Sequence, residues 1–341
     1  MKHKRVCPGI VAILVILVAG AAAVCRADDL TAKLDAPPPG VEVLYSAGQY
    51  GHAAEALQRA IDRNPKDAFL AYWLGRCFYE SHDFSRSISS LEHAIALDPG
   101  RSEYHDWLGR ASGRKADESR SNMASALSLA RRTHNEFQTA VRLDATNINA
   151  QRDLIAFMKS APGNLGGGEA RALEQIRALS AVDTVAGELA LADLYAERKR
   201  FDQAGEQYEK VLASTSHRIG DYFEVADYYR DRSDPGRMNA AVEAAARISS
   251  SDHRLTYYRG VALVIAKKDS AVAEKDLRSY IETVPDNSEV PAHSSTHEWL
   301  GRLYENEKRP DLATAQYQAA LTLDPQNKSL RDALRRLHKD R

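Results

Sequence analysis

Cysteine is scarce in this sequence, which has three among 341 residues, at positions 7, 25 and 77. Cys7 and Cys25 lie in an apolar N-terminal segment with the features of a removable leader, so Cys77 is the only cysteine expected in the mature chain. A single cysteine cannot form an internal disulfide. The sequence therefore excludes a disulfide-stapled fold, and stability must come from side-chain packing.

Motifs for catalysis and for metal or phosphate binding are also lacking. The sequence holds neither G-x-S-x-G nor H-E-x-x-H. The glycine-rich stretch 161–171 (APGNLGGGEAR) has no phosphate-loop spacing and follows a helical pattern, so it predicts a flexible turn between helices. His293 and His297 are four residues apart, but no third metal ligand is evident nearby. We predict no metal, no cofactor and no catalytic residues.

The composition is that of a soluble, folded protein, with 44% hydrophobic and 27% charged residues. Loss of residues 1–27 would remove four positive charges and no acid, taking the formal net charge from −1 to −5. A mildly acidic chain has no electrostatic reason to bind nucleic acid. We therefore predict a protein or peptide as the partner.

The N-terminus differs from the rest of the chain. A basic start (MKHKR) precedes 15 uncharged residues, 10–24, and then small residues. This order is typical of a signal peptide, here 1–27 with an alternative cut after Ala23, followed by a linker at 28–40. We predict a periplasmic or secreted protein. Membrane contact is expected only if the signal stays uncleaved as an anchor or Cys25 carries a lipid.

The tetrapeptide WLGR occurs three times, at 73–76, 107–110 and 299–302, and accounts for every tryptophan. The first two copies lie 34 residues apart. In the window 68–101, apolar residues recur at three- and four-residue spacings over two stretches, and Asp98-Pro99-Gly100 closes the second. This pattern predicts two amphipathic helices joined by a short turn.

This unit resembles the tetratricopeptide repeat, a helix A–turn–helix B hairpin, and similar windows recur along the chain. Residues 102–146 contain about twelve extra polar residues near 113–124, which we expect to lengthen the hairpin. Windows 147–184 and 219–252 fit by position alone. The residues that carry the resemblance are Ala60, Pro65, Leu74, Gly75, Ala94, Pro99, Leu108, Gly109, Ala140, Gly260, Leu300, Gly301, Ala320 and Pro325.

The resemblance implies an all-α, right-handed α-solenoid of about eight hairpins over 41–327, with a capping helix at 328–341. A glycine inside a helix costs about 0.8–1 kcal/mol relative to alanine. We therefore interpret Gly75, Gly109, Gly260 and Gly301 as points of close approach between helices. His105 and His297 both precede the tryptophan by two residues, which predicts a shared packing or groove role.

The resemblance also implies a concave groove, lined by helix A, that binds an extended or helical segment of a partner. By repeat register, the groove residues are expected to be Tyr72, Arg76, Tyr79, Asp106, Arg110, Arg152, Asp193, Tyr257, Glu298, Arg302 and Glu305. The predicted function is a non-catalytic scaffold or adaptor outside the cytoplasm. The alternatives are ordinary solvated side chains at these positions, an accessory subunit or hydrolase acting on envelope polymers, and self-association through the end repeats.

Overall fold

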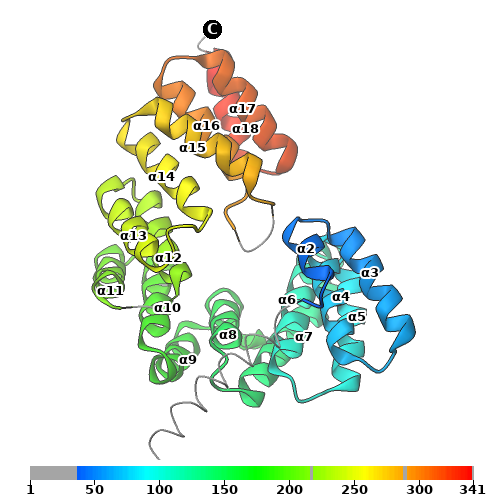
Figure 1. Cartoon of the computed structure of the whole chain (residues 1–341). Helices are drawn as coiled ribbons and strands as arrows, with labels where there is room; N and C mark the ends of the chain where they lie inside the picture. The colour runs from blue at the N-terminus through cyan, green and yellow to red at the C-terminus, as the bar shows by residue number, and fades with distance from the viewer. Residues whose placement is uncertain (1–36, 216–217, 287–289, 340–341) are drawn as a thin grey trace, which may run out of the picture.

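The computed structural model describes residues 37–215, 218–286 and 290–339. Over these residues the chain forms seventeen α-helices and one 3-10 turn, with no strand (Figure 1). The predicted signal peptide and residues 28–36 of the linker lie outside the described residues. None of the described helices combines the length and apolarity that crossing a bilayer requires.

The helices form eight consecutive antiparallel pairs and one final helix. In chain order the pairs are α2 (Val41–Ser46) with α3 (Tyr50–Arg63), α4 (Ala68–Glu80) with α5 (Phe84–Leu97), α6 (Ser102–Glu118) with α7 (Met123–Leu143), α8 (Ile148–Ser160) with α9 (Glu169–Val182), α10 (Thr184–Glu197) with α11 (Phe201–Ala213), α12 (Ile219–Asp231) with α13 (Pro235–Ile248), α14 (Arg254–Ala266) with α15 (Ser270–Thr283), and α16 (His293–Asn306) with α17 (Pro310–Leu323). Helix α18 (Lys328–Lys339) follows, and its Leu330 and Ala333 are buried in the core that also contains Tyr317 of α17. The predicted all-α solenoid with a capping helix is confirmed.

Local sequence explains where these helices begin and end. Side chains of Asp67, Asn147 and Asp183 accept hydrogen bonds from backbone N–H groups in the first turns of α4, α8 and α10, as N-caps do. Pro65, Pro99 and Pro325 each lie two residues beyond the last residue of a helix B, where a proline cannot be part of the helix. The predicted exit prolines are confirmed.

The glycines of the repeat lie where the two helices of a hairpin meet. A Cβ on Gly75 would lie 2.6 Å from Leu91 Cγ, and a Cβ on Gly109 would lie 2.5 Å from Phe137 Cε1. The same holds for Gly260 against Leu277 at 2.8 Å and Gly301 against Tyr317 at 2.4 Å. Since real Cβ atoms do not approach so closely, the predicted packing role of these four glycines is confirmed.

The irregular windows keep the same architecture. Helices α6 and α7, of 17 and 21 residues, absorb the extra residues near 113–124 as additional helical turns, so the hairpin is longer, as predicted. The windows predicted by position alone contain the hairpins α8–α9 and α12–α13, and the stack continues through both. The glycine-rich stretch forms the turn between α8 and α9, with a 3-10 turn at Gly163–Leu165.

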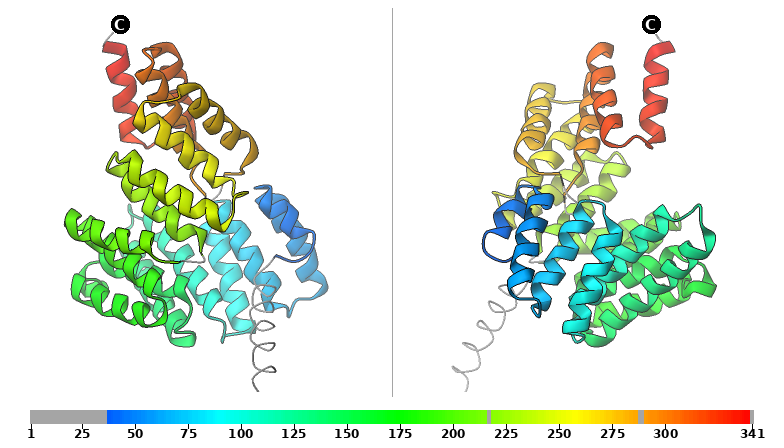
Figure 2. Two further views of the ribbon diagram at one scale, coloured as in Figure 1. Left: turned by 60° about the vertical axis from the view of Figure 1, so that its left-hand side comes forward. Right: turned by 90° about the vertical axis from the view of Figure 1, so that its right-hand side faces the viewer.

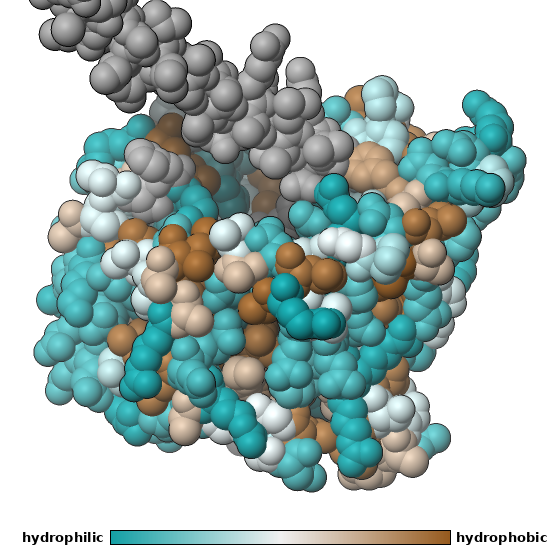
Figure 3. All heavy atoms as spheres, turned by 90° about the horizontal axis from the view of Figure 1, so that it is seen from below, coloured by the Kyte–Doolittle hydropathy of each residue, from teal (hydrophilic) through white to brown (hydrophobic). Residues whose placement is uncertain are grey.

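The solenoid curls until its last hairpins lie near its first two (Figures 1 and 2). A Cβ on Gly48, in the α2–α3 turn, would lie 3.4 Å from the Cβ of Pro285, just after α15. A crevice of about 410 Å³ is lined from both ends of the chain, by Tyr79 and Arg114 on one side and by Asp286 and Leu323 on the other. On the face in Figure 3, hydrophobic residues form separate spots among hydrophilic ones.

Candidate functional site

Each WLGR arginine lies over the tryptophan of its own tetrapeptide. The guanidinium carbon lies 4.1 Å from the ring centroid for Arg76 and Trp73, 4.9 Å for Arg110 and Trp107, and 4.4 Å for Arg302 and Trp299. Residues three apart on a helix share a face, and a guanidinium over an indole is attracted by the negative face of the ring. WLGR is therefore a packing unit in which arginine takes part.

Arg76 lies among aromatic rings from three hairpins. Besides Trp73, its guanidinium lies 4.3 Å from the Trp107 ring, 5.4 Å from the Tyr45 ring and 5.8 Å from the Tyr72 ring. Its Nη2 donates a hydrogen bond to the Tyr45 hydroxyl at 3.4 Å. Arg76 thus joins the first three hairpins, and this internal role occupies the side chain.

Helix α8 carries three charged residues that pair with three different helices. Asp153 accepts a hydrogen bond from Arg110 Nε of α6 at 2.5 Å. Lys159 lies 2.8 Å from Glu197 and 3.9 Å from Asp193, both on α10. Arg152 donates to both carboxylate oxygens of Glu224 on α12. Because these partners lie on successive helices A, α8 is the centre of an ionic network that ties these helices together.

Asp106 is part of this network and is buried, with 2% of its surface exposed. It lies 3.1 Å from Arg110 Nη2, and its Oδ1 has no hydrogen-bond partner among the described residues. Burial raises the pKa of Asp106 to about 8, and the nearby Asp153 carboxylate raises it further against the opposing effect of Arg110. The raised pKa of Asp106 therefore reflects first its burial among its neighbours.

The structure separates the predicted groove residues into two sets. Tyr72, Asp106 and Tyr257 are 4%, 2% and 1% exposed, so the prediction that they contact a partner is wrong. Tyr72 stacks on Tyr104, with ring centroids 4.8 Å apart, and Tyr257 packs against the Tyr258 and Tyr280 rings. Repeat register placed them on the correct helix, but the tight curl of the solenoid buries them between neighbouring hairpins.

The remaining predicted residues keep some exposed surface, and most of them have internal partners. Asp193 accepts from the Tyr208 hydroxyl at 2.6 Å and Glu305 accepts from the Tyr317 hydroxyl at 2.5 Å. Arg302 is the most exposed of them, with 49% of its side chain accessible, and it donates a hydrogen bond to Glu298 on the preceding turn of α16. Tyr79 is half-buried and lines the crevice between the two ends of the chain. Their contact with a partner stays a prediction.

The two histidines that share a repeat position do the same thing in their hairpins. His105 Nδ1 lies 2.7 Å from Glu136 of α7, and His297 Nδ1 lies 2.8 Å from Gln316 of α17. Each therefore bridges helix A to helix B, and of the two predicted shared roles, packing or groove, these contacts favour packing. His293 Nε2 instead contacts the Val284 carbonyl oxygen at 2.7 Å. Among the described residues no three potential ligands gather into a metal site.

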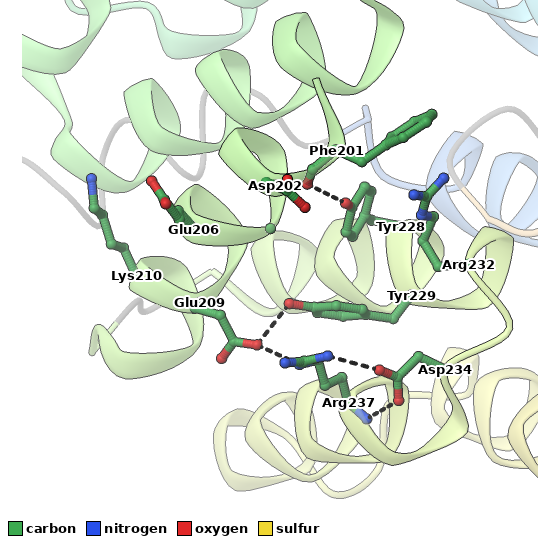
Figure 4. A pocket seen from close by; sticks show the side chains of 11 residues that line it. Phe201, Asp202, Glu206, Glu209, Lys210, Tyr228, Tyr229, Arg232, Asp234 and Arg237 are labelled. Atoms are coloured by element: carbon green, nitrogen blue, oxygen red, sulfur yellow. Dashed lines mark hydrogen bonds and ion pairs between the residues drawn. The ribbon is translucent and has the colours of Figure 1, made fainter. Parts of the chain in front are cut away.

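A cavity of about 790 Å³ was not anticipated from the sequence. It lies between α11 and the α12–α13 turn and is lined by Phe201, Tyr228 and Tyr229 together with charged residues (Figure 4). Arg232 lies 3.5 Å from the centroid of the Phe201 ring. Tyr229 and Arg237 both converge on Glu209, at 2.9 and 2.7 Å. The only sequence signal was the adjacent pair Tyr228-Tyr229, which a helical core explains equally well.

A second cavity, about 320 Å³, opens where α12, α14 and the start of α16 meet. Glu224 and Asp227 line it with Tyr258, whose ring stacks on Phe223 at 4.7 Å. Burial raises the pKa of Asp227 to about 6, while Arg230 opposes the rise. Burial also raises the pKa of Glu224, against Arg152. Two carboxyl groups with raised pKa values thus line one cavity.

Cys77 has no role in this chemistry. It is fully buried in α4, and burial raises the pKa of its thiol to about 12. A thiol with so high a pKa is not a nucleophile at neutral pH.

Comparisons with known proteins agree with this architecture. Residues 44–111 and residues 295–327 match family models described as tetratricopeptide repeat. A search of curated proteins finds no match.

Solved structures give the same result at the level of fold. Yeast Tom70 matches at a TM-score of 0.57 and 14% identity, over 85% of this chain and 58% of that one. The human IFIT1 dimer with m7Gppp-AAAA matches at 0.53 and 14%, over 85% and 67%. A tetratricopeptide repeat protein from Parabacteroides merdae matches at 0.48 and 13%, over 83% and 99%. The family models show that the chain contains tetratricopeptide repeats, and the structure continues them into one all-helical solenoid.

Proposed function

We propose that this protein is a non-catalytic scaffold that binds a protein or peptide segment in the concave face lined by its helices A. The observation that carries the proposal is the continuous stack from α2 to α18, whose even-numbered helices from α4 to α16 follow one another along the inner face. A solenoid of this kind presents one extended surface to a partner. Tetratricopeptide repeats in two separate segments support the same function.

Exposure guides the choice of side chains with which to test this proposal. Arg302 is half-exposed on α16, and Arg114 is exposed on α6 at the crevice between the two ends. Arg76 and Arg110 are held by aromatic rings and by carboxylates, so their replacement would disturb packing as well as binding. Arg114 and Arg302 are therefore better probes of the groove.

An affinity pulldown with residues 28–341 tests this proposal. The groove variant carries Arg114→Glu and Arg302→Glu, and the control carries Arg335→Glu on α18, the helix after the last hairpin, where Arg335 is 67% exposed. We expect a protein that is recovered by the wild type and the control and lost with the groove variant. Recovery by all three would place the interface on the outer face or the ends, and recovery by none would contradict a scaffold for partners in that extract.

We also propose that the protein acts outside the cytoplasm, in the periplasm or as a secreted protein. The support is the basic, apolar and small-residue order of residues 1–27. Fractionation of cells expressing the full chain, with N-terminal sequencing of the product, tests this proposal. A cytoplasmic product that begins at Met1 would contradict it.

A hydrolase of envelope polymers is the second candidate, and Glu224 and Asp227 are the observation that favours it. Both line the 320 Å³ cavity and have raised pKa values, as an acid–base pair would. Arg152 binds both Glu224 oxygens, which argues against a free catalytic carboxylate. Incubation with envelope polysaccharide and peptide fragments separates the two functions. Product release that Asp227→Asn abolishes would establish the hydrolase, and unchanged polymers would leave the scaffold.

A further inference from the structure

One ion pair in the concave face reaches past its neighbouring hairpin. Arg152 lies on α8 and Glu224 on α12, 72 residues further along the chain, with α10 between them in sequence. The other two charged residues of the α8 network, Asp153 and Lys159, reach only α6 and α10, the helices A on either side. Arg152–Glu224 is therefore a contact between hairpins four and six, and it depends on how tightly the solenoid curls.

The pair lies between two cavities. Arg152 lines a cavity of about 160 Å³ together with Ile155 and Asp193, and Glu224 lines the 320 Å³ cavity together with Phe223. The Arg152 and Glu224 side chains are themselves 27% and 33% exposed. An ion pair with open space on both sides is separable without removing apolar contacts from a packed core.

Arg152 has other carboxylates nearby with which it can pair when it separates from Glu224. The pKa of Arg152 is raised, against the effect of burial, by Glu224 and also by Asp193 and Asp221. The raised pKa of Glu224 shows that burial already disfavours its charged form. Separation would hydrate Glu224 and leave Arg152 close to Asp193, so the Arg152 cation keeps a counterion in the open arrangement.

We propose that the Arg152–Glu224 pair is a latch across the middle of the concave face, which holds the solenoid in the tightly curled state and is released when a partner enters the groove. The latched state places the protein's own side chains where the middle of a bound segment would lie. In the same state the α2–α3 turn lies next to Pro285, so the first hairpin approaches the segment after α15. The change of curl is independent of any partner, and the link to entry rests on the proposed function.

Small-angle X-ray scattering of residues 28–341 tests the latch without a partner. The variant Arg152→Gln/Glu224→Gln removes both charges at similar volume and leaves no unpaired charge behind. We expect the variant to have a larger radius of gyration than the wild type. We also expect its hydrogen exchange to be faster than in the wild type in α8 and α12, and unchanged in α4. The reversed pair Arg152→Glu/Glu224→Arg restores the contact with opposite polarity, and the wild-type radius is expected to return.

A matched control is the pair Glu92–Arg132, which joins α5 to α7 between adjacent hairpins, with 48% and 32% of the side chains exposed. The variant Glu92→Gln/Arg132→Gln removes an inter-helix ion pair of the same type that does not skip a hairpin, so its radius is expected to equal that of the wild type. Circular dichroism confirms the helical content of every variant. An unchanged radius in the Arg152/Glu224 variant, with helices intact, would overturn the latch.

Binding distinguishes the latch from the proposed function. When only a fraction of molecules is open, the apparent dissociation constant is raised by the inverse of that fraction. If about one molecule in ten is open, the unlatched variant should bind a partner found by pulldown about tenfold more tightly. If the unlatched variant has a larger radius but binds the partner with equal affinity, the pair holds the curl but its release is not coupled to binding. If no partner is found, the proposed function is contradicted and the scattering result is unaffected.

Discussion

The hairpins with the Trp-Leu-Gly sequence and the hairpins of the middle of the chain form the same fold by different contacts. In α4 and α6, Gly75 and Gly109 follow the N-cap residue by eight positions, and a side chain of helix B fills the space above each glycine. In α8 and α12 the same place is taken by Ile155 and Ala226, both buried. A glycine is thus one solution to close helix packing, and the middle hairpins use others.

The two regions also differ in what joins successive hairpins. At the N-terminal end, aromatic rings around Arg76 connect the first three hairpins. In the middle, the ion pairs of Asp153, Lys159 and Arg152 connect α8 to α6, α10 and α12. Aromatic packing has a fixed geometry, whereas partly exposed ion pairs can separate and exchange partners. This difference makes the middle of the solenoid the region expected to change shape.

The largest change in stability is expected for Trp107→Ala, which tests the contribution of the N-terminal aromatic cluster. Trp107 is 7% exposed and packs against Arg76 and Tyr79, so its truncation is expected to lower the free energy of unfolding by about 3–5 kcal/mol. Trp299 has the same motif but is only half-buried, and Trp299→Ala is expected to lower it by about half as much. Chemical denaturation measures both. Equal losses would mean that the aromatic cluster adds nothing beyond the motif itself.

The next effect concerns the glycines. Gly109→Ala places a Cβ against the Phe137 ring and is expected to destabilise the protein by about 1–3 kcal/mol. Gly205 lies inside α11 with its nearest contact at 4.0 Å, so Gly205→Ala should stabilise the protein by about 0.5–1 kcal/mol through helix propensity. Thermal denaturation followed by circular dichroism measures both shifts. Two shifts of the same sign would refute close approach as the reason for Gly109.

The intra-hairpin packing was predictable because the residues concerned lie within one 34-residue unit. Leu74, Gly75 and Ala94 recur at fixed spacing, so the sequence alone predicts which helices approach and where they end. The hairpins α8–α9 and α12–α13 were predictable only by position. In them Ile155 and Ala226 occupy the helix A position that is glycine in α4 and α6, so the repeat's sequence pattern is missing. Close helix packing can be recognised from the sequence only where one residue type alone allows it.

The pH dependence of stability sharpens the picture of the network around Asp106. Burial raises the pKa of Asp106 to about 8 in the folded protein, above its value of about 4 in the unfolded chain. Between these values the unfolded state binds fewer protons, so the free energy of unfolding falls as pH rises. Asp106→Asn mimics the protonated group and should remove this fall, so its stabilising effect relative to the wild type is expected to be largest at pH 8 and almost absent at pH 4.

Denaturation at several pH values checks this expectation, with Asp98→Asn as the control, because Asp98 is exposed beyond α5. If Asp106→Asn lowers stability at pH 8, the carboxylate is charged in the folded protein and its pairing with Arg110 dominates over burial.

The site was predictable only in part, because inter-hairpin contacts follow from the curl of the whole stack. Register predicted a groove position for Arg302, which is half-exposed, but it predicted the same for Tyr72 and Tyr257, which neighbouring hairpins bury. Arg152 was singled out without its partner, since Glu224 lies 72 residues away in a window that carries no repeat signal. Nothing in a local pattern encodes a distance of that kind.

The smallest effect on stability is expected at Arg302, which makes it the sharpest test of the groove at the C-terminal end. Its side chain is 49% exposed, pairs with Glu298 one turn earlier and lies over the Trp299 ring, and exposed contacts of these two kinds contribute together about 1 kcal/mol. Arg302→Ala should therefore leave the unfolding midpoint nearly unchanged, as should Arg335→Ala on the outer face of α18. Because both variants keep the fold, a loss of partner binding confined to Arg302→Ala would assign the guanidinium to the interface, whereas equal binding would make all three WLGR arginines packing residues.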